Sequence, residues 1–209
     1  MSEPTVNAVS GSAGRSRAHK ITVTAMLSAV AFLLMFVEFP IPALIPAFVK
    51  MDISDLPELL AAFSLGSVYG VAVSFLKNLL HILFKGTSSA YVGELFNFLM
   101  GAVFSASAGL IYRWKKTRRG ALLGSVVGAV LMAVLSVPLN YFVVYPAYVV
   151  CYELPLDVII GMYQEIRPAT NGLLECLVVF NMPFTLVKGL LDVLLCFLVY
   201  KPLSPLLHK

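Results

Sequence analysis

The sequence predicts an all-α integral membrane protein, and its composition and its long apolar runs are the observations that predict this class. Of its 209 residues, 59% are hydrophobic and 12% are charged, and the mean hydropathy is +0.89. Soluble domains carry about 25% charged residues, so a soluble protein with a large core is a poor alternative. Several apolar runs approach the ~20 residues that a membrane-spanning helix needs. We expect one compact membrane domain over residues 20–205.

The first apolar run follows a short polar segment. Residues 1–19 are rich in Ser, Gly and Ala and end in basic residues, so we interpret them as a disordered tail. The run over residues 21–37 is longer than the apolar core of a signal peptide, and no small-residue cleavage site follows it, so we expect a retained transmembrane helix. Ala25 and Ala29 lie four positions apart on this helix. Such a pair either lets a second helix approach closely or is ordinary helix-forming alanine.

A proline-rich segment follows this helix. Pro40, Pro42 and Pro46 exclude a regular helix there. The segment is nevertheless apolar, and apolar non-helical chain beside a membrane is tolerated where it packs on protein or covers a cavity. We therefore expect a lid over residues 39–55.

Five further helices are predicted after the lid. Ser54 and Asp55 are candidate caps, and Pro57 and Glu58 follow them, which is typical of the start of a helix. An outer loop with short helices is expected over residues 146–180, where prolines and glycines interrupt the apolar pattern. The expected helices run over residues 56–65, 68–84, 92–112, 121–137 and 181–200.

The basic residues give these six helices an orientation. Ten Lys and Arg residues fall in the N-terminal tail, the 113–119 loop and the C-terminus, where Glu3 is the only acidic residue. Six spans place all three segments on one side of the membrane, and the positive-inside rule makes that side the cytoplasm. Both termini are therefore expected in the cytoplasm. Five spans would place the 113–119 loop outside, so we reject that topology.

Polar residues from four helices then converge in the outer half of the bilayer. In the last helix, Asn181, Thr185 and Lys188 share one face, with Asp192 one turn further into the membrane. Charged side chains at membrane depth cost about 2.5–3.5 kcal/mol each on insertion scales and indicate function. The other converging residues are Lys77, Asn78, His81, Glu94, Asn97 and Asn140. We expect a ligand pocket beneath the lid, with apolar walls from Leu44, Phe48, Met51, Met182 and Phe184.

Several of these residues have structural alternatives. Lys188 could simply pair with Asp192, which would make both charges tolerable in the membrane. Asn140, close to Pro138, could satisfy the backbone of a kinked helix. A role in capping or packing, rather than in binding, is the alternative for Glu94, Asn97 and His81.

The sequence lacks the motifs of the main enzyme and nucleotide-binding classes. It contains no Gly-x-x-x-x-Gly-Lys-[Ser/Thr], no His-Glu-x-x-His and no Gly-x-Ser-x-Gly. Its three cysteines and three histidines form no metal-ligand pattern, and it has no basic face interleaved with aromatics for nucleic acid. We therefore expect no catalysis, no metal and no cofactor, and a neutral ligand that Asn and Lys can hydrogen-bond. The alternative is a self-contained secondary transporter with a proton relay of Lys77, Glu94, Lys188 and Asp192, although no inverted repeat supports it.

Five segments, taken together, resemble a known family. They are residues 48–57, 77–81, 86–88, 93–98 and 180–189. In order and spacing they resemble the riboflavin-specific substrate-binding (S) component of energy-coupling factor (ECF) transporters, the RibU type, over residues 20–205. The resemblance implies six transmembrane helices in a bacterial cell membrane. It also implies uptake of riboflavin from outside, driven by a transmembrane coupling protein and two cytoplasmic ATPases that the S-component joins.

The resemblance also implies roles for individual residues. The residues that would contact the isoalloxazine ring beneath the first loop are Asn140, Asn181 and Lys188. Ala25 and Ala29 match a small-residue pattern that the family uses to dock on its coupling protein. An S-component for another small vitamin, such as thiamine or a pyridoxine-like compound, is the alternative.

Overall fold

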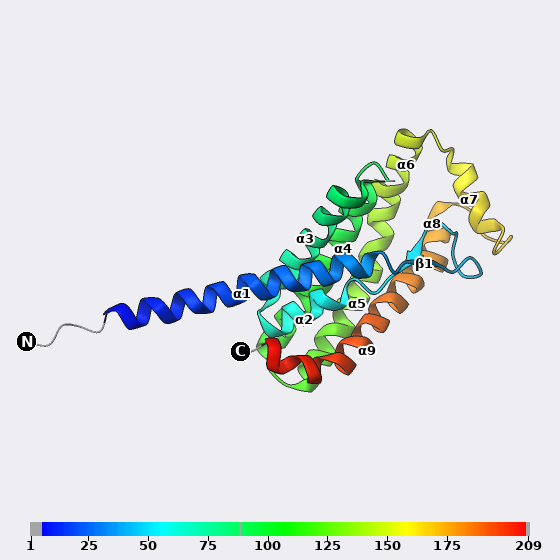
Figure 1. The fold of residues 1–209 in the computed structure, drawn as a ribbon. Coiled ribbons are helices and arrows are strands. Elements are labelled where there is room, and N and C mark those ends of the chain that lie inside the picture. The colour runs from blue at the N-terminus through cyan, green and yellow to red at the C-terminus, as the bar shows by residue number, and fades with distance from the viewer. Residues whose placement is uncertain (1–5, 88, 208–209) are drawn as a thin grey trace, which may run out of the picture.

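The computed structural model describes residues 6–87 and 89–207, and helices dominate this part of the chain (Figure 1). The first half contains α1 (Val6–Met35), β1 (Phe39–Pro40), β2 (Lys50–Met51), α2 (Leu56–Ser64), α3 (Ser67–Lys85), α4 (Val92–Trp114) and α5 (Arg118–Leu139). The second half contains the π-helical turn η1 (Asn140–Val144), α6 (Tyr145–Tyr152), α7 (Leu156–Gln164), α8 (Leu173–Cys176), the π-helical turn η2 (Leu177–Asn181) and α9 (Met182–Leu207).

Within the described residues, five helical segments are long and apolar enough to cross a membrane. They are Arg17–Met35, Ser67–Lys85, Val92–Trp114, Arg118–Tyr152 and Leu173–Tyr200. α2 has nine residues. At 1.5 Å per residue a helix of that length rises about 14 Å, roughly half the ~30 Å of the hydrocarbon core. Pro57 to Phe63 are buried, so α2 lies inside the bundle and not at its lipid surface.

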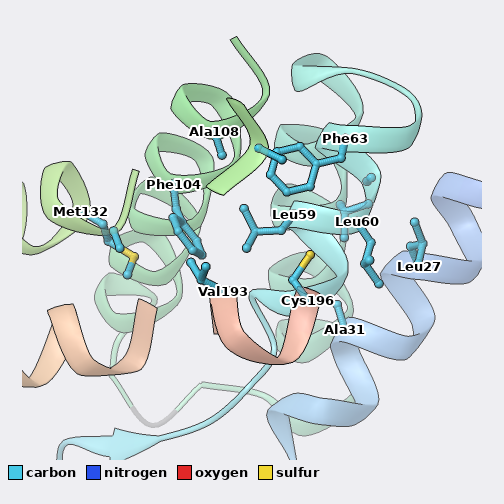
Figure 2. Packing of buried hydrophobic residues seen from close by; sticks show 14 of the residues in the cluster. Leu27, Ala31, Leu59, Leu60, Phe63, Phe104, Ala108, Met132, Val193 and Cys196 are labelled. Carbon is cyan, nitrogen blue, oxygen red and sulfur yellow. The ribbon is translucent and has the colours of Figure 1, made fainter. Parts of the chain in front are cut away.

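The main apolar core surrounds α2. Leu59 and Phe104 are fully buried, and Phe63, Met132 and Val193 pack in the same cluster, which draws on α1–α5 and α9 (Figure 2). Small residues set the distance between α4 and α5, because a Cβ added at Gly124 would lie 2.7 Å from the carbonyl oxygen of Ala108. A side chain there would force the two helices apart.

α1 begins earlier than predicted. The sequence predicts a disordered tail to residue 19, but the helix starts at Val6, and only residues 1–5 of that tail lie outside the described part. Between Pro4 and Pro40 the chain has no proline, so no residue in that stretch sterically stops the helix from extending back.

The outer loop is shorter than predicted. The sequence predicts irregular chain over residues 146–180, but the fifth span runs on through η1 and α6 to Tyr152, and the last span begins at Leu173. Pro138 lies inside α5 and does not end it. After it the helix widens into the π turn η1, where the side-chain amide of Asn140 donates to the carbonyl of Ser136 at 2.8 Å. α9 likewise continues past Pro202 to Leu207.

The lid is closed at its base by a short antiparallel pair of strands. Phe39 pairs with Met51 and Pro40 with Lys50, so residues 41–49 form the loop between β1 and β2. Glu38 forms salt bridges at this base, where its carboxylate lies 2.7 Å from Lys50 Nζ and 3.0 Å from Lys85 Nζ at the end of α3. The lid is thereby connected to the end of α3.

Candidate ligand-binding site

A cavity of about 470 Å³ lies beneath the lid. This volume falls within the range of roughly 300–1,000 Å³ that is usual for small-molecule sites. The lid, α3, α4, the α5–α6 span and the η2–α9 span all contribute to its walls. Seven of the ten residues predicted to bind a ligand line it: Phe48, Glu94, Asn97, Asn140, Asn181, Thr185 and Lys188.

Leu44, Met51 and Lys77 do not line the cavity, so the structure does not support direct ligand contact for these three predicted residues. Leu44 is 62% exposed at the outside of the lid, whereas Met51 is buried in the apolar cluster under it. Lys77 is fully buried, and its ammonium lies 2.7 Å from Glu58 and also pairs with Asp55. The sequence could not show that two carboxylates enclose Lys77, because both come from the segment at the start of α2.

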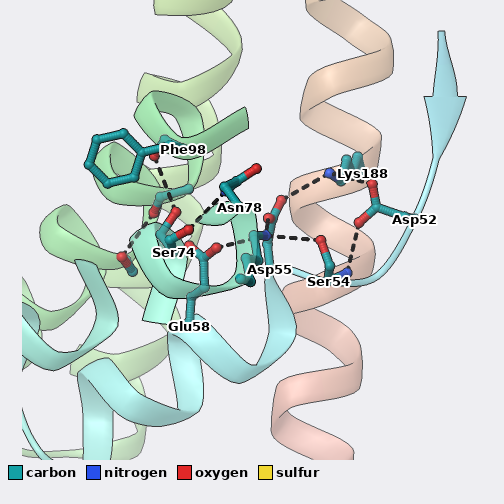
Figure 3. Close-up of polar contacts among 11 residues, drawn as sticks. Asp52, Ser54, Asp55, Glu58, Ser74, Asn78, Phe98 and Lys188 are labelled. Carbon is teal, nitrogen blue, oxygen red and sulfur yellow. Dashed lines mark hydrogen bonds and ion pairs between the residues drawn. The ribbon is translucent and has the colours of Figure 1, made fainter. Parts of the chain in front are cut away.

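The floor of the cavity is an ion-paired group that joins the lid to α9. Lys188 Nζ lies 3.1 Å from Asp52 Oδ2 and 3.1 Å from Asp55 Oδ2 (Figure 3). Asp55 is shared, because Lys77 binds its other carboxylate oxygen. Asp55 is therefore a carboxylate that neutralises both ammonium groups.

Asp192 is not the salt-bridge partner of Lys188, although the sequence offered that pairing as an alternative. The ion pairs of Lys188 go to Asp52 and Asp55 instead. Asp192 is fully buried, and neither of its carboxylate oxygens has a hydrogen-bond partner among the described residues. The acids that hold Lys188 come from the end of the lid, far away in the chain, so helical spacing could not reveal them.

Both asparagines of the cavity sit on π-helical turns. Asn140 is the first residue of η1, and Asn181 is the last residue of η2. Such turns displace side chains from the regular helical path and occur often at functional sites. Asn140 donates to the carbonyl of Ser136, so its predicted alternative role in a kinked backbone is real, and it also lines the cavity.

Two tyrosines that were not among the predicted site residues surround Asn181. Tyr163 on α7 donates to Asn181 Oδ1 at 2.6 Å, and Tyr145 on α6 lies 3.4 Å from Asn181 Nδ2. Both rings are buried. The sequence signal was a tyrosine within an otherwise apolar segment of the outer loop, where a buried hydroxyl needs a partner.

The opposite wall is built around Glu94. Its Oε2 accepts from Thr87 Oγ1 at 2.9 Å and from Ser89 Oγ at 2.7 Å, while His81 Nδ1 lies 3.6 Å from its Oε1. Glu94 therefore stabilises the turn between α3 and α4, which agrees with its predicted structural alternative. It also lines the cavity together with Asn97.

Ala25 and Ala29 lie away from the cavity on the outer face of α1. Both are exposed, while Val23, Leu27 and Ser28 on the other face are buried against the bundle. The small-residue pair is therefore available for contact outside the chain.

A family model for the ECF transporter substrate-specific component matches residues 19–200. The chain belongs to this family of S-components. A solved structure of the S component of a bacterial ECF transporter superposes with a TM-score of 0.71 at 33% identity, covering 92% of this chain and 99% of that one.

Curated relatives of this S-component are transporters. It is 35% identical to the riboflavin transporter RibU of Staphylococcus aureus, over 91% of this chain and 93% of that protein. It is 36% identical to the riboflavin transporter RibU of Streptococcus thermophilus, over 91% and 85% of the two chains. It is 28% identical to the riboflavin transporter FmnP of Bacillus subtilis, over 91% and 94%. The S-component is thus a multi-pass protein of a bacterial membrane.

Proposed function

We propose that this S-component binds riboflavin from outside the cell and delivers it to an ATP-driven ECF transporter. The observation that carries the proposal is the cavity beneath the lid, in which Asn140, Asn181 and Lys188 converge from two helical spans. The relatives named as riboflavin transporters cover nearly the whole chain, so the same ligand is the natural expectation for this cavity.

In the proposed ligand pose, Lys188, Asn181 and Asn140 hydrogen-bond the pyrimidine edge of the isoalloxazine ring. An ammonium has three donors, of which Asp52 and Asp55 occupy two, so one remains for a ring carbonyl. Thr185 lies one turn from Asn181 and adds a hydroxyl. Phe48 of the lid is the apolar wall, and Glu94 and Asn97 face the remainder of the ligand.

We further propose six membrane crossings with both termini in the cytoplasm. α2 is too short to cross by itself. The chain before it, however, already descends into the bundle, since Asp52 and Asp55 reach Lys188 at the floor of the cavity. Non-helical backbone is tolerated at that depth because protein surrounds it. The end of the lid and α2 together make the second crossing, and the basic segments then fall on one side.

The proposed partners are a transmembrane coupling protein and two cytoplasmic ATPases. The chain has no P-loop of its own, so the energy must come from other subunits. The exposed pair Ala25 and Ala29 on α1 is the proposed docking site for the coupling protein. Small side chains let two helices in a membrane approach closely.

Titration of the purified chain with riboflavin, followed by quenching of flavin fluorescence, tests the proposal. Saturable quenching at one ligand per chain supports it, and thiamine and pyridoxine serve as comparison ligands in a thermal-shift assay. A chain that neither quenches nor is stabilised by riboflavin would overturn it. Uptake into liposomes by the lone chain under a proton gradient would instead support a secondary transporter.

A further inference from the structure

Three buried polar side chains form a closed set of hydrogen bonds at one wall of the cavity. The Tyr163 hydroxyl donates to Asn181 Oδ1 at 2.6 Å, Asn181 Nδ2 donates to the Tyr145 hydroxyl at 3.4 Å, and the two hydroxyl oxygens are 2.5 Å apart. Asn181 and Tyr145 line the cavity, but Tyr163 does not. Tyr163 is fully buried on α7, which lies at the end of the molecule away from both termini (Figure 1).

The donor and the acceptor of each hydrogen bond in this set can be assigned in one consistent way. Because Tyr163 gives its only hydroxyl hydrogen to Asn181, the short contact between the hydroxyls requires Tyr145 to donate to Tyr163. O–H···O bonds centre near about 2.7 Å and N–H···O bonds near about 2.9 Å, so the 2.6 Å separation fits the carbonyl oxygen of Asn181. One of the two amide hydrogens of Asn181 is therefore left for a ligand acceptor.

Aromatic contacts fix the position of the Tyr163 ring, and with it the direction of the hydroxyl that donates to Asn181. Phe48 of the lid meets it edge-on at 6.3 Å between ring centroids, and Phe180 lies at 5.3 Å. Burial raises the pKa of Tyr163 far above its usual value, so the hydroxyl keeps its proton and remains a donor. The outer loop thus supplies a fixed donor to a residue of the cavity wall.

We propose that Tyr163 is a positioning residue for ligand binding, which orients the amide of Asn181 without touching the ligand. This inference rests on the proposed riboflavin-binding function. Without the Tyr163 hydroxyl, the carbonyl oxygen of Asn181 loses its donor and the amide is free to rotate or flip. The amide hydrogen that faces the cavity is then no longer held in the binding geometry.

The test is riboflavin titration of Tyr163→Phe, which removes one oxygen atom and keeps the ring. We expect a roughly 3- to 10-fold weaker affinity, the usual value of one buried hydrogen bond. Tyr91→Phe, at an exposed tyrosine, is the matched control and should bind like the wild type. In an Asn181→Leu background the same Tyr163→Phe change should alter affinity less than about two-fold, because residues that act through one another are not additive.

Two further measurements distinguish positioning from a general packing role. Infrared bands of the carbonyls of bound riboflavin should shift in Tyr163→Phe in the same direction as in Asn181→Leu. Replacing Tyr163 with 4-aminophenylalanine, which restores a donor at the ring position, should recover most of the affinity. That variant also tests the inference if Tyr163→Phe does not fold.

The outcomes separate this inference from the proposed function. Unchanged affinity in Tyr163→Phe, an equal loss with and without Asn181, or no recovery with 4-aminophenylalanine overturns the positioning role while riboflavin binding stands. Failure of the wild type to bind riboflavin overturns the proposed function itself, before any variant is compared.

Discussion

Lys188 Nζ lies 3.1 Å from Asp52 Oδ2, although 136 positions separate the two residues in the chain. The contact brings the end of the lid onto the last transmembrane helix at the floor of the cavity. Asp55 takes a second contact from the same ammonium, so the proposed ligand-binding lysine is held by lid residues on one side. The position of the lid and the position of the Lys188 side chain therefore depend on each other.

Lys188→Met tests the direct role of this ammonium. We expect riboflavin binding to weaken by about 1–3 kcal/mol, because a charged hydrogen bond to the ligand is lost in a buried site. Fluorescence titration measures the change, and Lys116→Met in the exposed loop before α5 is the control. Equal affinity in the Lys188 variant would restrict Lys188 to holding the lid.

Asp55→Asn tests the shared carboxylate. The side chain is 1% exposed and pairs with both Lys77 and Lys188, so its neutralisation leaves buried positive charge with fewer partners. Breaking a buried pair costs about 3–5 kcal/mol. We expect a marked loss of thermal stability in detergent, while Asp157→Asn, at an exposed acid, has little effect. A wild-type unfolding midpoint in Asp55→Asn would contradict the role given to this carboxylate.

The base of the lid predicts a pH dependence. Burial opposes ionisation of Glu38, but its hydrogen bonds to Lys50 and Lys85 dominate, and its pKa falls below the ordinary 4.5. A folded-state pKa that is lowered stabilises the closed base fully above pH 4.5 and loses this effect as the pH falls through the lowered value. Glu38→Gln should therefore speed riboflavin release at neutral pH, and the difference from wild type should vanish in acid.

The size of this effect is small because the groups are partly exposed. Surface ion pairs contribute about 0.2–1 kcal/mol, so we expect release to be no more than about five-fold faster. Stopped-flow fluorescence measures the rates, with Glu153→Gln as the control at an exposed acid of the outer loop. A difference between wild type and Glu38→Gln that persists at the lowest pH would show that charge is not the cause.

The exposed face of α1 predicts a separation of binding from transport. Leucines in place of Ala25 and Ala29 should block close approach of a partner helix, since small residues are what permit it. We expect unchanged riboflavin affinity but at least about ten-fold less ATP-dependent uptake with the coupling protein and ATPases in proteoliposomes. Val187→Leu, at an exposed position of α9, is the control. Uptake at the wild-type rate would remove the docking role from this pair.

The sequence was sufficient to predict that both cavity asparagines belong to the site, but not their local structure or their hydrogen-bond partners. Polarity and position in the helices, together with the resemblance to the family, predicted a binding role for Asn140 and Asn181, and both line the cavity. Their π-helical turns and the tyrosines around Asn181 were not predicted, because hydrogen bonds between distant segments leave no periodic signal. Met51 was predicted to face the ligand, but the pairing of β2 with β1 turns it into the apolar cluster instead.

The sequence by itself determined the membrane class, the family and the set of helices that carry the site. These follow from apolar run lengths and from motifs with local spacing, which depend only on neighbouring residues. Only the tertiary structure decided that Lys188 pairs with Asp52 and Asp55 and not with Asp192, and that Lys77 is enclosed by acids. The strength of an ion pair depends on the distance between the two charges. The order of residues in the sequence does not give that distance when the residues are far apart in the chain.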